Sequence, residues 1–304
     1  MSNPDSEIVS ECKMATGCSA VRMILTPKVK DLGGFSVRRA LPVIACRSVG
    51  PWVFFDHMGP AEFDAGQGID VRPHPHIGLA TVTYLFEGEM LHRDSLGNTQ
   101  VIRPGEINLM VAGRGIVHSE RQRPEVKAAP QKIHGLQLWL ALPTEQEQTE
   151  PAFYHYEHTD IPESKQNNVL TRVMMGSAYG VTSPVKTHSK TLYVEARLQK
   201  GQSLRLPDAE ERAIYVVQGA ITLNKTLITT DSMVILENLP DLAITASSDT
   251  VIAIIGGSPL GNRHLEWNFV ASNQALIEQA KLDWSAGRFD KVPGDDKEFI
   301  PLPG

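Results

Sequence analysis

Four side chains of the kinds that ligate metal ions occur as two pairs with the same spacing. His74-Pro75-His76 and His118-Ser119-Glu120 each place two such groups two residues apart. Residues i and i+2 of a β-strand point to the same face, so each segment can aim both groups in one direction. If the two segments lie close together in space, three imidazoles and one carboxylate converge. The spacing therefore predicts a divalent-metal site with the ligands His74, His76, His118 and Glu120.

The donor set limits the metal and its chemistry. Neutral imidazoles and a carboxylate suit Fe(II), Ni(II), Co(II), Cu(II), Mn(II) or Zn(II), and the lack of thiolates argues against a cysteine-type structural zinc site. Three imidazoles and one carboxylate leave a divalent ion with a formal charge of about +1, which can bind and polarise an anionic oxygen ligand. Such a set leaves coordination positions open. This favours a reactive centre over an ion that only holds the fold together.

Other polar residues near these segments have two interpretations each. His155-Tyr156-Glu157 repeats the His-x-Glu spacing but lies in a polar stretch, and we interpret it as a surface pair. His92 either hydrogen-bonds to a ligand imidazole or ends an ordinary surface strand. His57 and Asp56 either line the mouth of the pocket or cap a turn. The sequence contains no Gly-x-Ser-x-Gly motif, phosphate-binding loop or dinucleotide fingerprint.

Short strand patterns surround the predicted ligands. Residues 80–86 are rich in β-branched and aromatic side chains and are apolar on both faces, as in a central strand of a barrel or sandwich. Residues 107–111 and 116–120 form strand patterns joined by a glycine-containing bend, and residues 136–142 have one aliphatic face. Turn residues separate these stretches. The pattern predicts an all-β domain in this half of the chain.

The second half of the chain repeats the first without its ligands. Residues 82–88 resemble residues 213–219, with Tyr84 and Tyr215 in register. At this offset, His74 and His76 correspond to Arg205 and Pro207, and no His-x-Glu pair follows. We therefore predict a second β domain that lacks metal ligands.

The composition suggests how these parts are divided. A stretch rich in Glu, Gln, Thr and Pro separates the two β-rich halves. We predict a flexible leader (1–20), a metal-binding domain (21–145), a connector (146–168), a second domain (169–260), and a C-terminal helix and tail (261–304).

A helix is predicted near the C-terminus. Ser272 is a suitable N-cap, and Gly287 would end the helix. The apolar positions that share one face are Leu276, Ile277, Ala280 and Trp284. We expect this face to pack at the seam between the two β domains.

Charge and cysteine content constrain partners and compartment. The 304 residues carry a net charge of −6 without a Lys/Arg run, so direct nucleic-acid binding and an anionic membrane surface are not expected. No apolar run approaches the ~18 residues of a membrane span. Residues 1–19 lack a signal-peptide core. Cys12, Cys18 and Cys46 cannot all pair; Cys12 and Cys18 could form a metal or redox pair, but we favour unpaired thiols in a cytoplasmic protein.

These features together resemble the pirins, which are members of the cupin superfamily. The similar segments are His74-Pro75-His76-Ile77-Gly78, residues 81–88, His92-Arg93-Asp94-Ser95, Arg103-Pro104-Gly105, residues 112–120, residues 256–261 and residues 285–289. The resemblance covers most of the chain and is most specific in its first half. It implies two jelly-roll β-barrel cupin domains in tandem. It also implies one metal ion in the N-terminal barrel, held by His74, His76, His118 and Glu120.

The resemblance implies two kinds of function. Some pirins are described as quercetin 2,3-dioxygenases, which implies a small aromatic or enolic substrate, O2, and Glu120 as both a ligand and a catalytic base. Others are described as iron-dependent nuclear co-regulators, which implies a metal-responsive protein that binds a protein partner without turnover. Among the possible divalent metals, we favour Fe(II).

The sequence departs from the pirin pattern at three places. Ile77 replaces a common arginine, and Ala80 replaces a common acidic residue. We expect both to lie close to the metal and to alter substrate fit. The segment 266–270 differs from the commoner Gly-Pro-Phe-Val form and is expected to reshape the pocket wall.

Overall fold

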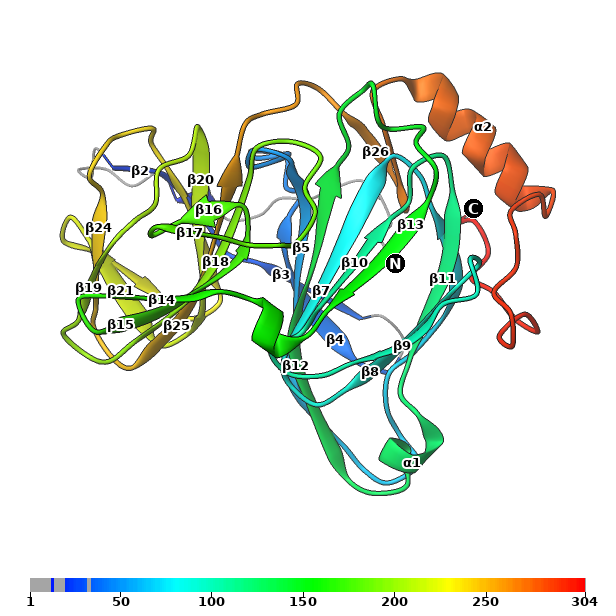
Figure 1. The fold of residues 1–304 in the computed structure, drawn as a ribbon, viewed down its shortest axis with the longest axis horizontal. Helices are drawn as coiled ribbons and strands as arrows, with labels where there is room; N and C mark the ends of the chain where they lie inside the picture. Colours follow the sequence, from blue (N-terminus) through cyan, green and yellow to red (C-terminus); the bar gives the residue numbers. More distant parts are fainter. Residues whose placement is uncertain (1–11, 14–19, 32–33, 304) are drawn as a thin grey trace.

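Two β-barrels lie side by side in the computed structural model, which describes residues 12–13, 20–31 and 34–303 (Figure 1). The described residues also include helices α1 (Pro124–Lys127) and α2 (Gln274–Ser285) and a 3-10 helix (His158–Asp160). The prediction of an all-β chain with two barrels is confirmed. Neither α-helix in these ranges has the length and apolar character that crossing a membrane requires.

The N-terminal barrel consists of a seven-stranded and a four-stranded antiparallel sheet. In spatial order, the larger sheet contains β13 (Ala152–Tyr156), β10 (Ile107–Val111), β7 (Leu79–Glu87), β12 (Gln131–Ala141), β5 (Trp52–Phe63), β4 (Ser36–Leu41) and β3 (Lys28–Asp31). The smaller sheet contains β6 (Asp70–His76), β11 (Ile116–Arg121), β8 (Met90–Asp94) and β9 (Thr99–Ile102). The strands predicted at 80–86, 107–111, 116–120 and 136–142 are confirmed in β7, β10, β11 and β12.

The C-terminal barrel has a similar construction. Its eight-stranded sheet contains β1 (Cys12–Lys13), β2 (Val21–Leu25), β23 (Ser232–Leu236), β20 (Glu211–Gln218), β25 (Thr250–Gly257), β18 (Thr191–Leu198), β15 (Val169–Met175) and β14 (Glu163–Gln166). Its four-stranded sheet contains β19 (Ser203–Arg205), β24 (Ala243–Ala246), β21 (Ala220–Leu223) and β22 (Thr226–Thr229). A separate hairpin is formed by β16 (Ser177–Ala178) and β17 (Val181–Thr182).

Aliphatic side chains fill the interior of the C-terminal barrel. Leu204, Ile214 and Ile244 belong to one fully buried cluster there. Arg205, which the repeat offset matches to His74, is exposed, because neighbouring residues of a strand face opposite sides. The inward positions of β19 and the following residues are therefore Leu204 and Leu206, and they carry aliphatic side chains.

Strand pairing changes two of the expected domain limits. β2, expected within the metal-binding domain, pairs with β23 in the C-terminal barrel. The expected connector 146–168 contains β13, which pairs with β10, and β14, which pairs with β15. The polar composition of this segment did not prevent it from forming strands. Strand pairing uses backbone N–H and C=O groups, so a polar segment can still add to the edge of a sheet. Most of the expected leader lies outside the described residues, although Cys12–Lys13 form β1.

The two larger sheets pack against each other and form a shared apolar core. Tyr84 of β7 and Tyr215 of β20, the residues in register between the halves, are both buried in it. The indole Nε1 of Trp52 donates hydrogen bonds to the carbonyl oxygens of Leu192 (3.2 Å) and Gly256 (3.1 Å). The barrels are therefore joined by a continuous core and by hydrogen bonds across it.

Helix α2 packs on the N-terminal barrel, so the expectation of a helix at the seam is wrong. Ile277 and Ala280 are buried in a cluster with Trp267 and with Phe269 of β27 (Phe269–Ala271), which pairs with β26 (His264–Glu266). Figure 1 shows α2 on the side away from the C-terminal barrel. Ile77, which follows β6, belongs to the same cluster, so the cluster connects the helix and the β26–β27 hairpin to the N-terminal barrel.

The cap of α2 also differs from the expected one. Asn273 caps the helix by accepting a hydrogen bond from the Ala275 amide at 2.8 Å. The hydroxyl of Ser272, the expected cap, instead donates to Glu147 at 2.6 Å. Because the Ser272 hydroxyl is bound to Glu147, the next residue, Asn273, caps the helix.

Candidate metal centre

The two predicted ligand segments are neighbouring antiparallel strands. His118 of β11 lies directly opposite His74 of β6, and Ile116 lies opposite His76. The register shifts between His118 and Glu120, which marks a β-bulge beside the site. Bulges re-aim side chains and are common next to functional sites.

Three imidazoles converge at one point of the barrel interior. One ring nitrogen from each of His74, His76 and His118 lies within 4.8 Å of the others, and all three residues are buried. The Nε2 atoms of His76 and His118 are 3.1 Å apart. Two nitrogens bound at right angles to one ion, each about 2.0–2.1 Å away, are about 3 Å apart. The spacing of these two nitrogens therefore fits ligands of a single transition-metal ion.

Backbone carbonyls determine which nitrogen of His74 and His76 carries the proton. His74 Nδ1 lies 2.9 Å from the Arg72 carbonyl oxygen, and His76 Nδ1 lies 3.0 Å from that of Asn268. A carbonyl oxygen only accepts, so each Nδ1 must donate its hydrogen. In the neutral rings, Nε2 then carries the lone pair that a metal ion needs.

His92 and the carboxylate of Asp94 determine which nitrogen of His118 carries the proton. The buried His92 places Nε2 3.0 Å from the carboxylate of Asp94, which can only accept when ionised. When its ring is neutral, His92 therefore has a lone pair on Nδ1, which lies 3.4 Å from Nδ1 of His118. The chain Asp94–His92–His118 thus leaves Nε2 of His118 unprotonated. The ring of His92 also stacks on Phe153 with centroids 4.3 Å apart.

Burial keeps the three imidazoles neutral. It lowers the pKa of His74 to about 3 and lowers the pKa values of His76 and His118 well below 6.5. Burial raises the pKa of Asp94, but hydrogen bonds from His92 and Asn98 outweigh it, and the pKa of this carboxyl is lower than usual. Near neutral pH the site therefore presents uncharged nitrogen donors beside an ionised supporting carboxylate.

Glu120 lines the same pocket but lies outside the cluster of three imidazoles. Its Oε1 accepts a hydrogen bond from Gln137 Nε2 at 3.2 Å, and Gln137 in turn accepts one from Thr83 at 2.8 Å. Burial raises the pKa of Glu120 to about 7, although hydrogen bonds oppose the shift. A carboxyl group with this pKa can exchange a proton near neutral pH.

The pocket at the imidazoles is small, and its lining combines aromatic and aliphatic side chains with polar and charged ones. Its volume is about 200 Å³. Phe54 and Trp139 stack in one wall with ring centroids 3.9 Å apart, and the Trp139 ring meets the His76 ring edge-on at 5.0 Å. Asn268 and Ile300 complete the wall from the C-terminal part of the chain. Aromatic side chains therefore form part of the pocket wall beside the imidazoles.

Only one of the two candidates at the pocket mouth lies there. Asp56 lines the pocket and accepts two hydrogen bonds from Arg39 at 2.8 and 2.7 Å. His57 faces the seam between the barrels, where Nδ1 is 3.0 Å from the Tyr215 hydroxyl and Nε2 is 2.8 Å from His134 Nε2. The expectation for His57 is wrong because consecutive residues of β5 point to opposite faces.

The two family departures near the ligands do not lie in the pocket wall. Ile77 packs in the cluster of Trp267 and Phe269, and Ala80 is buried in the core between the barrels. Neither residue is therefore among those that line the pocket. The third departure, segment 266–270, does reach the site through Asn268, which lines the pocket and accepts from His76.

The second His-x-Glu pair forms a cluster of its own. His155 and Glu157 lie near Glu106, with His155 Nε2 3.8 Å and 3.5 Å from the two carboxylates. Glu157 is exposed, and His155 Nδ1 lies 2.7 Å from Asn108 Oδ1. This cluster is separate from the three imidazoles and is consistent with a surface pair.

Sequence reasoning did not single out Gln137 or Ile300, and it anticipated Asn268 only as part of segment 266–270. Gln137 carried a weak signal, as the polar residue in the middle of an otherwise apolar strand. Ile300 carried none, because its contact with the pocket is made through long-range folding. Cys46, one of the three thiols, is buried and donates to the Ser48 carbonyl at 3.3 Å, whereas the side chains of Cys12 and Cys18 lie outside the described residues.

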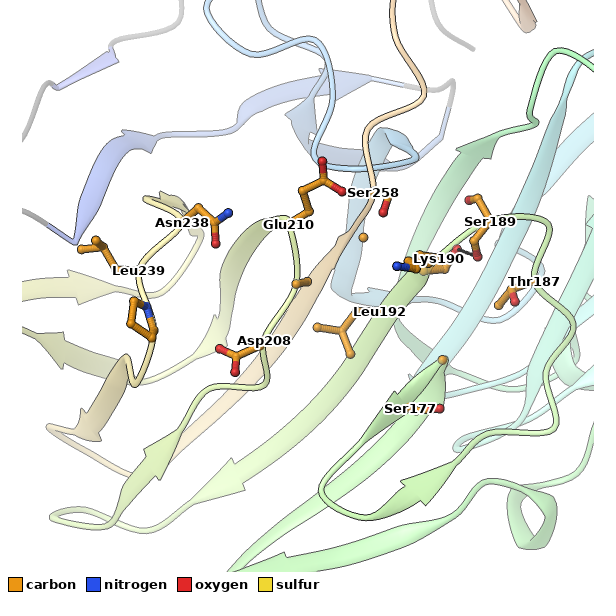
Figure 2. A pocket seen from close by; sticks show the side chains of 15 residues that line it. Ser177, Thr187, Ser189, Lys190, Leu192, Asp208, Glu210, Asn238, Leu239 and Ser258 are labelled. Atoms are coloured by element: carbon orange, nitrogen blue, oxygen red, sulfur yellow. Dashed lines mark hydrogen bonds between the residues drawn. The ribbon is translucent and has the colours of Figure 1, made fainter.

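A larger cavity lies elsewhere, on the C-terminal barrel. It measures about 930 Å³ and is lined by polar side chains such as Ser189, Lys190 and Asp208. Figure 2 shows these side chains spaced around a broad opening, and they do not converge on one point. The smaller pocket is the better candidate site, because His74 and His76 of the imidazole cluster line it.

Family comparisons cover both barrels. The family model described as Pirin matches residues 34–140, and the one described as Pirin C-terminal cupin domain matches residues 193–290. A pirin-like protein of Caulobacter vibrioides is 42% identical over 287 residues, which are 93% of this chain and 99% of that protein. Human Pirin is 31% identical over 276 residues, 86% of this chain and 90% of that protein.

Solved structures share the same fold. A crystal structure of quercetin 2,3-dioxygenase from Acinetobacter baumannii is 34% identical, with a TM-score of 0.86 over 92% of this chain and 94% of that one. The bacterial pirin YhhW of Escherichia coli, solved in complex with nickel(II), is 22% identical, with a TM-score of 0.60 over 77% of this chain and 96% of that one.

Proposed function

Because the chain belongs to the pirin family, we propose that it is a metal-dependent dioxygenase of quercetin-type flavonols or related enolic substrates. The observation that carries this proposal is the convergence of three imidazoles, two of which, His74 and His76, line a pocket that Phe54 and Trp139 also line. The similarity to a protein named as a quercetin 2,3-dioxygenase supports it.

His74, His76 and His118 would hold one divalent ion, with Glu120 as a fourth donor. We favour Fe(II) over Ni(II), Co(II), Cu(II), Mn(II) and Zn(II), because imidazole and carboxylate donors with open positions are typical of non-heme iron oxygenases. When bound, the ion supplies Lewis-acid polarisation of an enolic oxygen and a redox partner for O2.

The protein's own contribution is to position the substrate and accept its proton. Phe54 and Trp139 line the pocket with aromatic side chains that can contact a ring of the substrate. Glu120, with a pKa raised to about 7 by burial, would accept the enolic hydroxyl proton. Coordination to a cation lowers a carboxyl pKa, so Glu120 serves as a donor to the ion or as a base, and not as both at once. Its hydrogen bond from Gln137 keeps the carboxylate in the pocket in either role.

The test combines metal analysis with product detection. Elemental analysis of protein from its native host identifies the ion, and oxygen uptake and carbon monoxide release are then measured with quercetin and a panel of flavonols. We expect His76→Ala to lose both metal and activity, whereas His155→Ala, which removes an imidazole outside the pocket, keeps both. A fully metal-loaded protein that is inert toward every flavonol would refute the proposal.

The same protein preparations distinguish the alternative, a metal-responsive regulator. In that case a protein partner is retained by the metal-loaded form and released by His118→Ala, with no oxygen uptake. Partner affinity that does not change in His118→Ala rules the alternative out.

A further inference from the structure

The C-terminal tail forms part of the wall of the metal pocket. After α2, the chain returns along β11, as Figure 1 shows in red. Ile300 is buried and lines the pocket together with Asn268. Its amide donates to the Pro73 carbonyl at 2.8 Å, and its carbonyl accepts from Trp284 Nε1 at 3.0 Å. Ile300 is thereby attached next to His74 on one side and to α2 on the other.

The tail is also attached to the strand that carries His118 and Glu120. These two residues and the pair Ser119 and Arg121 alternate along β11, so the second pair can face away from the pocket. Arg121 donates to both carboxylate oxygens of Asp295, at 2.7 and 2.8 Å, and to Glu298 at 2.9 Å. One face of β11 therefore serves the metal pocket while the other holds the tail.

The volume of the pocket that Ile300 lines limits the size of the ligands that it can hold. The pocket closed by the tail measures about 200 Å³. Pockets for drug-sized ligands measure roughly 300–1,000 Å³. A three-ring flavonol needs more room than a single ring bearing the same enolic hydroxyl and keto group, so a pocket of this volume favours the smaller ligand.

We propose that Ile300 is the specificity-determining residue of this pocket, and that the Arg121–Asp295 clamp holds it in place. With the tail closed, the pocket accepts single-ring enolic ligands. Binding of a three-ring flavonol requires Ile300 to move off the pocket. This inference rests on the proposed function for the choice of ligands, but it concerns binding and not turnover.

The test compares two ligands that share one metal-binding group. Dissociation constants of 3-hydroxy-4-pyranone and quercetin are measured by calorimetry with full-length, metal-loaded protein under argon. We expect Ile300→Ala to tighten quercetin binding about tenfold, in the range that one apolar group provides in a pocket, and to leave the pyranone unchanged. Asp295→Asn, which weakens the clamp without touching the pocket, should shift the ratio in the same direction.

A matched control and a second readout separate this effect from general loosening. Leu302→Ala removes a side chain of similar size from the same tail, where Leu302 packs on the cluster outside the pocket, and it should leave the ratio unchanged. In the wild type, quercetin should accelerate hydrogen exchange of the Ile300 amide, and the pyranone should not.

The outcomes separate this inference from the proposed function. If the ratio of the two dissociation constants is the same in wild type, Ile300→Ala and Leu302→Ala, the role of Ile300 in selecting ligands by size is refuted, and the proposed function is not affected. If no form of the protein binds either ligand in a metal-dependent way, both the role of Ile300 and the proposed function are refuted. Binding with the expected ratio but without turnover overturns only the dioxygenase.

Discussion

Replacing His92 with phenylalanine tests whether the chain Asp94–His92–His118 prepares the metal site. Phenylalanine can keep the stacking on Phe153 but cannot accept the hydrogen of His118 Nδ1. His118 then either buries an unsatisfied N–H, at a cost of about 1–3 kcal/mol, or moves its proton to the nitrogen that faces the ion. Both consequences weaken metal binding.

The expected magnitude follows from the geometry. Loss of a hydrogen-bonding partner behind a metal ligand typically lowers metal affinity about 10–100-fold, or roughly 1.4–2.7 kcal/mol. The distance of 3.4 Å between the two Nδ1 atoms is long for a hydrogen bond. We therefore expect a loss of about tenfold, at the lower end of this range.

The assay is a competition titration of metal-free protein against a chromophoric chelator at pH 7.5, with Zn(II) and Ni(II) as probes. His155→Phe is the matched control, because His155 also uses Nδ1 in a hydrogen bond but lies in a separate cluster. His118→Ala provides the limit of a lost ligand. If His92→Phe binds metal within a factor of two of the wild type while remaining folded, the reasoning about the proton on His118 is wrong.

Two further predictions concern stability. Gly78 has φ +67°, and an added Cβ would lie 1.9 Å from the Val270 carbonyl oxygen, so Gly78→Ala should destabilise the fold by at least about 2 kcal/mol. Gly97→Ala, with φ +88° but open space, is the control, and equal melting temperatures of the two variants would contradict the clash. Burial, with smaller contributions from His57 and Arg38, lowers the pKa of His134 to about 4. The unfolded chain, with a histidine pKa near 6.5, then binds a proton that the folded chain does not, so stability falls as pH drops from 6.5 toward 4. His134→Gln should lose stability less steeply in urea titrations between pH 7.5 and 5, and parallel curves would refute this origin.

Local patterns in the sequence were sufficient for the strands and for the three imidazoles. The alternation of a β-strand depends only on neighbouring residues, so the His-x-His spacing already places both imidazoles on one face. The same alternation, applied to Asp56-His57, would have shown that only one of the two can face the pocket. Applied to residues 204–207, it would have shown that the inward-facing residues are Leu204 and Leu206. The repeat offset matched the two ligand positions to the residues that follow them by one, Arg205 and Pro207.

The surroundings of the imidazoles depend on contacts that only the tertiary structure makes. Asn268, which orients His76, is 192 residues away in the sequence, and Asp295, which pairs with Arg121, is 174 residues away. The tail that carries Asp295 and Ile300 has no helical or strand periodicity that could predict its path. The sequence by itself therefore determined which side chains share a strand face. Only the tertiary structure decided which residues surround these side chains. Strand register and the path of the tail set those contacts, and both depend on the free energy of the whole fold.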